Sequence, residues 1–78
     1  MDNGERNFIR NECMDIPVNE FMDRYEKRFN FRPFDYSILG YLLVDDDGII
    51  TGLFEGKKEE IDKNQENIFN KHFVKYSP

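Results

Sequence analysis

Two short apolar runs on either side of an Asp-Asp-Asp-Gly sequence at residues 45–48 place the strongest constraint on the fold of this chain. The first run covers residues 38–44 and is interrupted by Gly40, and the second covers residues 49–54. An Asp-Gly pair between apolar runs is a strong short-range signal for a β-hairpin. The sequence therefore predicts a hairpin at its centre. The alternative is a short buried helix over residues 34–44, because a continuous apolar run looks alike in strand and helix.

An amphipathic helix is predicted before the hairpin, over residues 17–30. Its apolar side chains recur every three or four residues and form one stripe: Val18, Phe21, Met22, Tyr25 and Phe29. This spacing is typical of a helix that buries one face. Asp15 is placed to cap the helix, and Pro17 suits its first turn. Because Pro33 disfavours helical geometry at the residue before it, the helix should end near Asn30.

A second amphipathic helix is predicted after the hairpin, over residues 58–75. The side chains along one side of it are Ile61, Ile68, Phe69, His72, Phe73 and Tyr76. Acidic residues come early in this segment, and Lys71 and Lys75 come late, as the helix dipole prefers. Asp62, with Gln65 three residues later, resembles a capping box.

These segments combine into one small two-layer α+β domain over residues 8–76, in the order helix, β-hairpin, helix. A two-stranded hairpin is marginal alone, so the helices are expected to cover one of its faces. Residues 1–7 have no apolar residue after the Met and are predicted to form a disordered tail. The apolar side chains of residues 8–16 repeat neither every two residues, as in a strand, nor every 3.6, as in a helix. This segment is predicted to be either extended or helical chain. The alternative fold is all-α, with residues 34–44 as a short buried helix.

Structural metals and disulfides are not expected in this chain. Cys13 is the only cysteine, so a disulfide within the chain is excluded. His72 is the only histidine, and one Cys with one His cannot fill the four-ligand shell of a structural zinc ion.

The acidic turn sequence was also compared with a calcium-binding loop. Aligning Gly48 with the loop glycine places Asp45 and Asp47 at two ligand positions. However, Leu43 and Phe54 then occupy the first and last ligand positions, where carboxylates are required. The sequence therefore favours a solvated acidic turn over a metal site.

A catalytic function is not expected. Cys13 and His72 are single residues with no catalytic motif around either of them. Gly48, Gly52 and Gly56 are evenly spaced and lack the pattern of a phosphate-binding loop. Carboxylate catalysis needs a cleft, which a domain of 78 residues with its acids on turns rarely has. The chain is interpreted as a non-enzyme that uses no cofactor.

The net charge of −5 is concentrated in one part of the chain. Residues 33–56 contain five acids and no base, whereas residues 17–32 and 57–78 each have a balance of +1. Direct binding to nucleic acid or to an anionic membrane needs a basic face, so neither is expected.

No stretch approaches the ~20 apolar residues of a membrane span, and the start lacks a signal-peptide pattern. With a single cysteine, these features predict a cytoplasmic protein.

The acidic segment, together with the aromatic residues beside it, suits a basic surface on another protein. The predicted partner-binding residues are Asp35, Tyr36, Tyr41, Asp45, Asp46, Asp47, Phe54 and Glu55. The sequence favours a protein-binding module, a regulator or inhibitor that docks its acidic hairpin on a basic site of a larger protein, such as a nucleic-acid-binding site. The alternative is a structural subunit that forms a homodimer through its hairpin edge or aromatic face.

Overall fold

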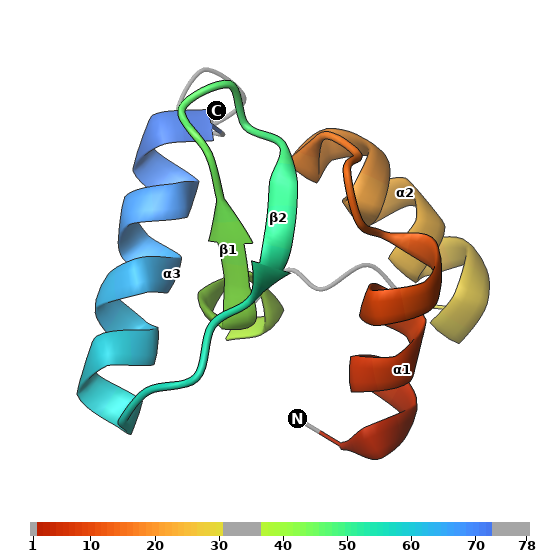
Figure 1. The fold of residues 1–78 in the computed structure, drawn as a ribbon, viewed down its shortest axis with the longest axis horizontal. Helices are drawn as coiled ribbons and strands as arrows, with labels where there is room; N and C mark the ends of the chain where they lie inside the picture. Colours follow the sequence, from red (N-terminus) through yellow and green to blue (C-terminus); the bar gives the residue numbers. More distant parts are fainter. Residues whose placement is uncertain (1, 31–36, 73–78) are drawn as a thin grey trace.

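The structure is a computed structural model that describes residues 2–30 and 37–72. Along the chain its elements are helix α1 (Asn3–Glu12), helix α2 (Val18–Phe29), the 3-10 helix η1 (Ser37–Tyr41), strand β1 (Leu42–Val44), strand β2 (Ile50–Leu53) and helix α3 (Lys58–His72). Figure 1 shows the hairpin with α3 on one side and the pair α1 and α2 on the other. This arrangement confirms the predicted α+β fold with a helix, a hairpin and a helix in that order.

Helix α1 lies where sequence analysis predicts a tail over residues 1–7. The Asp2 side chain accepts a hydrogen bond from the Glu5 N–H, and the Glu5 side chain accepts one from the Asp2 N–H, which completes a capping box. The hydroxyl of Tyr25 on α2 donates to Glu5 Oε2 at 2.9 Å. Phe8 and Ile9 are buried against the core. The capping box and these tertiary contacts stabilise a helix whose first residues are polar.

Helix α2 forms as predicted, and its buried face carries Val18, Phe21, Met22 and Tyr25. It ends at Asn30, which takes a left-handed conformation with φ 65°. Asparagine tolerates this conformation better than most residues do. The predicted cap by Asp15 is wrong, because Pro17 is the N-cap residue and no side chain caps this helix. Instead, Asp15 has φ 64° and belongs to the turn between α1 and α2.

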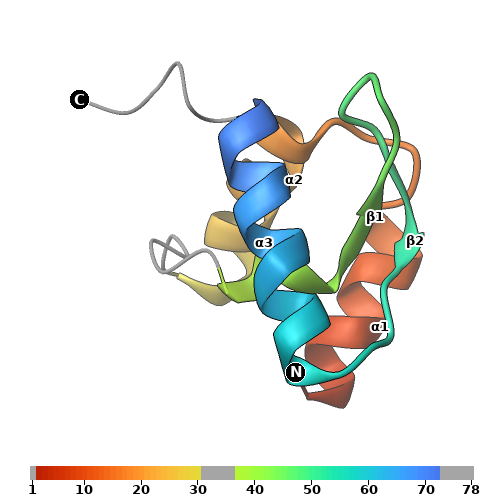
Figure 2. The same cartoon turned by 90° about the vertical axis from the view of Figure 1, so that its left-hand side faces the viewer.

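The β-hairpin has one covered and one open face. Strands β1 and β2 are antiparallel and pair Leu42 with Leu53, Leu43 with Gly52, and Val44 with Ile50, so a bulge leaves Thr51 without a partner. Leu42 and Ile50 are fully buried, whereas Leu43 and Thr51 are exposed. In Figure 2, which is turned by 90° from Figure 1, α2 and α3 both lie to the left of the two strands. These two helices thus cover one face of the hairpin, as the predicted two-layer architecture requires.

The alternative helix over residues 34–44 does not form in the part of it that the structure describes. Residues 37–41 make the short 3-10 helix η1, and residues 42–44 form strand β1. Residues 34–36 lie outside the described part of the chain.

A third segment, the turn between α1 and α2, pairs with the outer edge of β2. Asp15 N–H donates to the Ile50 carbonyl at 2.8 Å, and Ile50 N–H donates to the Ile16 carbonyl at 2.9 Å. Val18 N–H donates to the Gly48 carbonyl at 3.0 Å. An isolated antiparallel bridge joins Pro17 to Ile49 between these bonds. The linker between α1 and α2 therefore occupies the edge of β2 that β1 leaves free.

Helix α3 packs closely on η1 and contacts the start of β1 through Asn64. It begins at Lys58, so the predicted capping box of Asp62 and Gln65 is wrong, and Asp62 instead pairs with the Lys58 ammonium at 2.9 Å. The Asn64 amide donates to the carbonyls of Gly40 and Leu42, both at 2.9 Å. The predicted helix over residues 58–75 is confirmed as far as His72, and residues 73–75 lie outside the described part.

The core lies where the helices meet the inner face of the hairpin. Its fully buried side chains are Ile9, Cys13, Phe21, Leu39, Leu42 and Ile50. Among the described helices, none has the length and apolar character needed to cross a membrane.

Replacing Gly40 by Ala tests the close approach of η1 to α3. An added Cβ would lie 2.5 Å from the Ile61 carbonyl oxygen, so the two elements would have to separate. We expect Gly40→Ala to lower the free energy of unfolding by about 1–3 kcal/mol in urea denaturation. Gly4→Ala is the matched control, because its Cβ would meet nothing closer than 3.4 Å and alanine favours the helix. Equal stability of Gly40→Ala and the parent would contradict this packing.

Candidate protein-binding surface at the hairpin turn

The turn between β1 and β2 is held by the side chain of Asp45. Its Oδ1 accepts hydrogen bonds from the N–H groups of Asp47 and Ile49, both at 2.9 Å. The backbone closes the same turn, because Gly48 N–H donates to the Asp45 carbonyl at 3.0 Å. Gly48 has φ 81°, a conformation that suits glycine. Asp45, which the sequence predicts to bind a partner, thus stabilises the turn.

Asp46 and Asp47 extend from this turn into solvent. The Asp46 side chain is 101% exposed, and its Oδ1 lies 3.0 Å from the Lys71 ammonium at the end of α3. Such an exposed ion pair contributes roughly 0–1 kcal/mol, so a cation from outside can replace Lys71 at little cost. Within the described part of the chain, no donor or cation contacts the Asp47 carboxylate.

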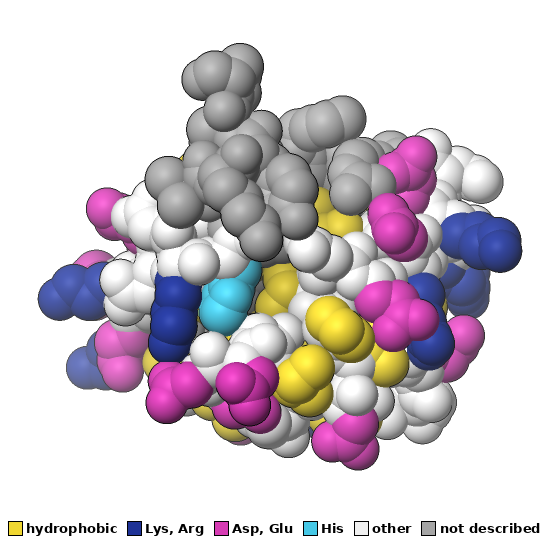
Figure 3. Space-filling view, turned by 90° about the horizontal axis from the view of Figure 1, so that it is seen from above, with side chains coloured by type: hydrophobic (Ala, Val, Ile, Leu, Met, Phe, Trp, Pro, Cys, Tyr) yellow, Lys and Arg dark blue, Asp and Glu magenta, His cyan; other side chains and the backbone are white. Residues whose placement is uncertain are grey.

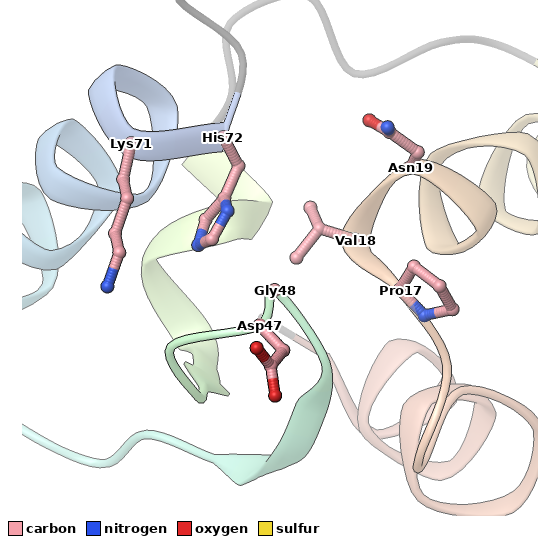
Figure 4. A pocket seen from close by; sticks show the side chains of 7 residues that line it. All are labelled: Pro17, Val18, Asn19, Asp47, Gly48, Lys71 and His72. Carbon is pink, nitrogen blue, oxygen red and sulfur yellow. The ribbon is translucent and has the colours of Figure 1, made fainter.

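A shallow hollow of about 250 Å³ separates the turn from the start of α2 and the end of α3. It is lined by Pro17, Val18, Asn19, Asp47, Gly48, Lys71 and His72, as Figure 4 shows. Figure 3 looks onto this end of the molecule, where acidic and apolar side chains lie next to one another along the lower rim. The volume is below the ~300 Å³ at which ligand pockets usually begin, so the hollow alone does not indicate a small-molecule site.

His72 faces Gly48 across this hollow. An added Cβ on Gly48 would lie 3.2 Å from His72 Nδ1. Burial lowers the pKa of the imidazole below its usual 6.5, Lys71 lowers this pKa further, and Asp45 opposes both effects. Burial and Lys71 thus disfavour the charged imidazole, and Lys71 is the cation that contacts the acidic turn, through Asp46.

The other predicted partner-binding residues are not gathered at the turn. Tyr41 and Phe54 lie at the opposite end of the hairpin, where Phe54 N–H donates to the Tyr41 carbonyl at 2.8 Å, and both are half-buried. Glu55 follows them and lies 3.6 Å from the Arg6 guanidinium on α1. Asp35 and Tyr36 lie outside the described residues.

Cys13 does not have the properties of a nucleophile. It is fully buried, and burial raises the pKa of its thiol to about 11. The thiol is therefore protonated at neutral pH, whereas a reactive cysteine needs the thiolate. Among the described residues, no group of three or more His, Cys, Asp or Glu side chains could hold a metal ion.

Two residues near the turn were missed by sequence reasoning. Lys71 comes to Asp46 from 25 positions away in the sequence, and no local pattern predicts that contact. Leu43 is exposed although its neighbour Leu42 is fully buried. Because both belong to one continuous apolar run, the alternation of strand faces could have separated them only if the register were known.

Replacing Gly48 by Val tests the geometry of the turn. The positive φ is unfavourable for a β-branched residue, and the new side chain would also press on His72. We expect a loss of roughly 1–2 kcal/mol in the free energy of unfolding, together with a shifted His72 ring resonance in NMR spectra. Gly48→Asn is the control, because asparagine tolerates the left-handed region and should cost less. A Val variant as stable as the Asn variant would show that this φ is not required.

In comparisons with protein-family models, with curated proteins and with solved structures, nothing matches this chain.

Proposed function

We propose that this chain is a non-enzymatic protein-binding module, a regulator or inhibitor that docks its acidic hairpin turn on a basic site of a larger protein. The observation that carries the proposal is the state of the turn's two outer carboxylates. Asp46 is fully exposed and held by one exposed ion pair, and Asp47 has no partner among the described residues. Both extend from a turn that is fixed internally by Asp45.

The internal hydrogen bonds of the turn favour binding because they reduce the entropy lost on docking. A loop that is already ordered does not have to be immobilised when its partner arrives. Complementary charge then acts mainly on the encounter rate and on the choice of partner. A rigid acidic turn is thus suited to fast association with a cationic surface.

Basic sites of this kind include those that bind DNA or RNA, because the phosphate backbone is recognised through Lys and Arg side chains. A protein that places carboxylates on such a site competes with the nucleic acid for the same cations. Inhibition by competition is therefore the mode of regulation that we propose.

Homodimer formation through the hairpin edges is the competing proposal, and two contacts count against it. Residues 15–18 already occupy the outer edge of β2. At the outer edge of β1, the Leu42 carbonyl accepts a hydrogen bond from Asn64 on α3. Covered edges of this kind oppose edge-to-edge pairing of sheets.

The test compares three tagged variants with the parent in capture from cell lysate and in binding kinetics with the captured protein. We expect the parent to retain a basic protein, and Asp46→Asn/Asp47→Asn to associate with it about tenfold more slowly at low salt. Lys71→Gln should associate faster than the parent, because it removes the internal competitor for Asp46. Glu55→Gln is the control, since Arg6 already partly neutralises this acid.

The Asn substitutions keep the size of the side chains and leave Asp45 intact, so the turn itself should persist. Equal association rates of the parent and Asp46→Asn/Asp47→Asn, at low and at high salt, would contradict docking through the turn.

A further inference from the structure

The open face of the hairpin carries an exposed apolar side chain next to the acidic turn. Among the described residues, Leu43 is the large hydrophobic side chain that is exposed, at 42%. It points away from the helices, on the face opposite to the fully buried Leu42. Thr51 on β2 is also exposed, and its hydroxyl donates to the Leu43 carbonyl at 3.3 Å.

The strand opposite Leu43 has no side chain at the pairing position. Leu43 pairs with Gly52, and an added Cβ on Gly52 would lie 3.3 Å from Leu43 Cδ1. The leucine therefore lies across the glycine, in close approach to the β2 backbone. Glycine within a strand often marks such a point of approach. The bulge at Thr51 further increases the local twist of the strand.

Charge indicates what kind of partner this face can accept. Asp46 and Asp47 follow Leu43 by three and four residues, at most roughly 10–13 Å of extended chain, which the turn shortens. Within residues 37–56 there is no basic side chain. At the other end of the hairpin, Glu55 is paired with Arg6. At the turn, Lys71 pairs with Asp46 and balances only one of three acids, so the unbalanced negative charge lies there.

We infer that Leu43, Thr51 and Gly52, together with Asp46 and Asp47, form one docking face for a protein segment that carries an apolar side chain within about 10 Å of Lys or Arg. This inference rests on the proposed function and specifies the partner's chemistry. The segment lies on the face of the hairpin and does not add a strand, because residues 15–18 and Asn64 occupy the two edges. The leucine makes the apolar contact, whereas the acids orient the partner and raise the rate of encounter.

Two synthetic peptides serve as probes in NMR titrations of the full chain. The first is Lys-Lys-Ser-Ser-Leu-Ser-Ser-Lys-Lys, whose side chains follow the same order from either end, so that it can bind in either orientation. The second peptide has Asn in place of Leu. We expect the parent to bind the leucine peptide roughly three- to tenfold more tightly than the asparagine peptide. The amide resonances of Leu43, Thr51 and Gly52 should shift with the leucine peptide.

Leu43→Thr is the deciding variant, because threonine keeps the strand propensity and removes most of the apolar surface. It should bind both peptides equally, with the weaker, salt-dependent affinity of the asparagine peptide. A parent without preference between the peptides, or without binding to either, would overturn the inference, as would a preference that survives in Leu43→Thr. Concentration-dependent dimerisation that Leu43→Thr abolishes would also overturn it, in favour of a second copy as the occupant.

The failure of this inference is distinguishable from that of the proposed function. If Asp46→Asn/Asp47→Asn weakens both peptides while the leucine has no effect, acidic docking stands and the apolar contact is wrong. If the same double variant binds both peptides as the parent does, the acidic turn does not bind cations, and the proposed function fails with the inference.

Discussion

Three backbone hydrogen bonds join the linker between α1 and α2 to the edge of the hairpin. They connect the first half of the molecule, formed by α1 and α2, with the second half, formed by η1, the hairpin and α3. They join Asp15, Ile16 and Val18 to Ile50 and Gly48, over distances of 2.8–3.0 Å. A hairpin of two short strands is marginal alone. The linker therefore gives β2 a second neighbour, and Ile50, fully buried, becomes the centre of the sheet layer. Helix α2 has no side-chain cap, and one of these bonds gives the Val18 N–H at its start an acceptor, the Gly48 carbonyl.

The hairpin is fixed from its other side by α3. Gly40 allows η1 to approach the α3 backbone closely, and Asn64 bonds to the carbonyls of Gly40 and Leu42. With both edges held, the turn projects from a framework that limits its motion. The carboxylates of Asp46 and Asp47 then have a defined position relative to the open face around Leu43. The contacts that hold the two edges of the hairpin thus also fix the position of the acidic turn.

The elements that sequence analysis predicts are those with a local signal. Helix α2 has an apolar stripe, and the hairpin has an Asp-Gly turn whose glycine does take a positive φ. The first part of helix α1 was missed because it is polar, although Asp2 and Glu5 have the spacing of a capping box. For residues 8–16 the sequence allowed either extended or helical chain, and residues 8–12 are helical. At the site, the acidic turn was predictable, but its neighbours were not. The proximity of Lys71, the linker on β2 and the outward direction of Leu43 all depend on tertiary packing and register.

Amide hydrogen exchange at Ile50 and Val18 tests the central claim, that the linker and β2 form one cooperative unit. Ile50 N–H donates to Ile16 and Val18 N–H donates to Gly48, so both should exchange only when the whole domain unfolds. Their free energies of opening should then equal the global value from denaturation, and should match those of the core amides of α2. Rapid exchange at Ile50 and Val18 while the α2 amides stay protected would show that the two halves open independently, and would contradict this account of the fold.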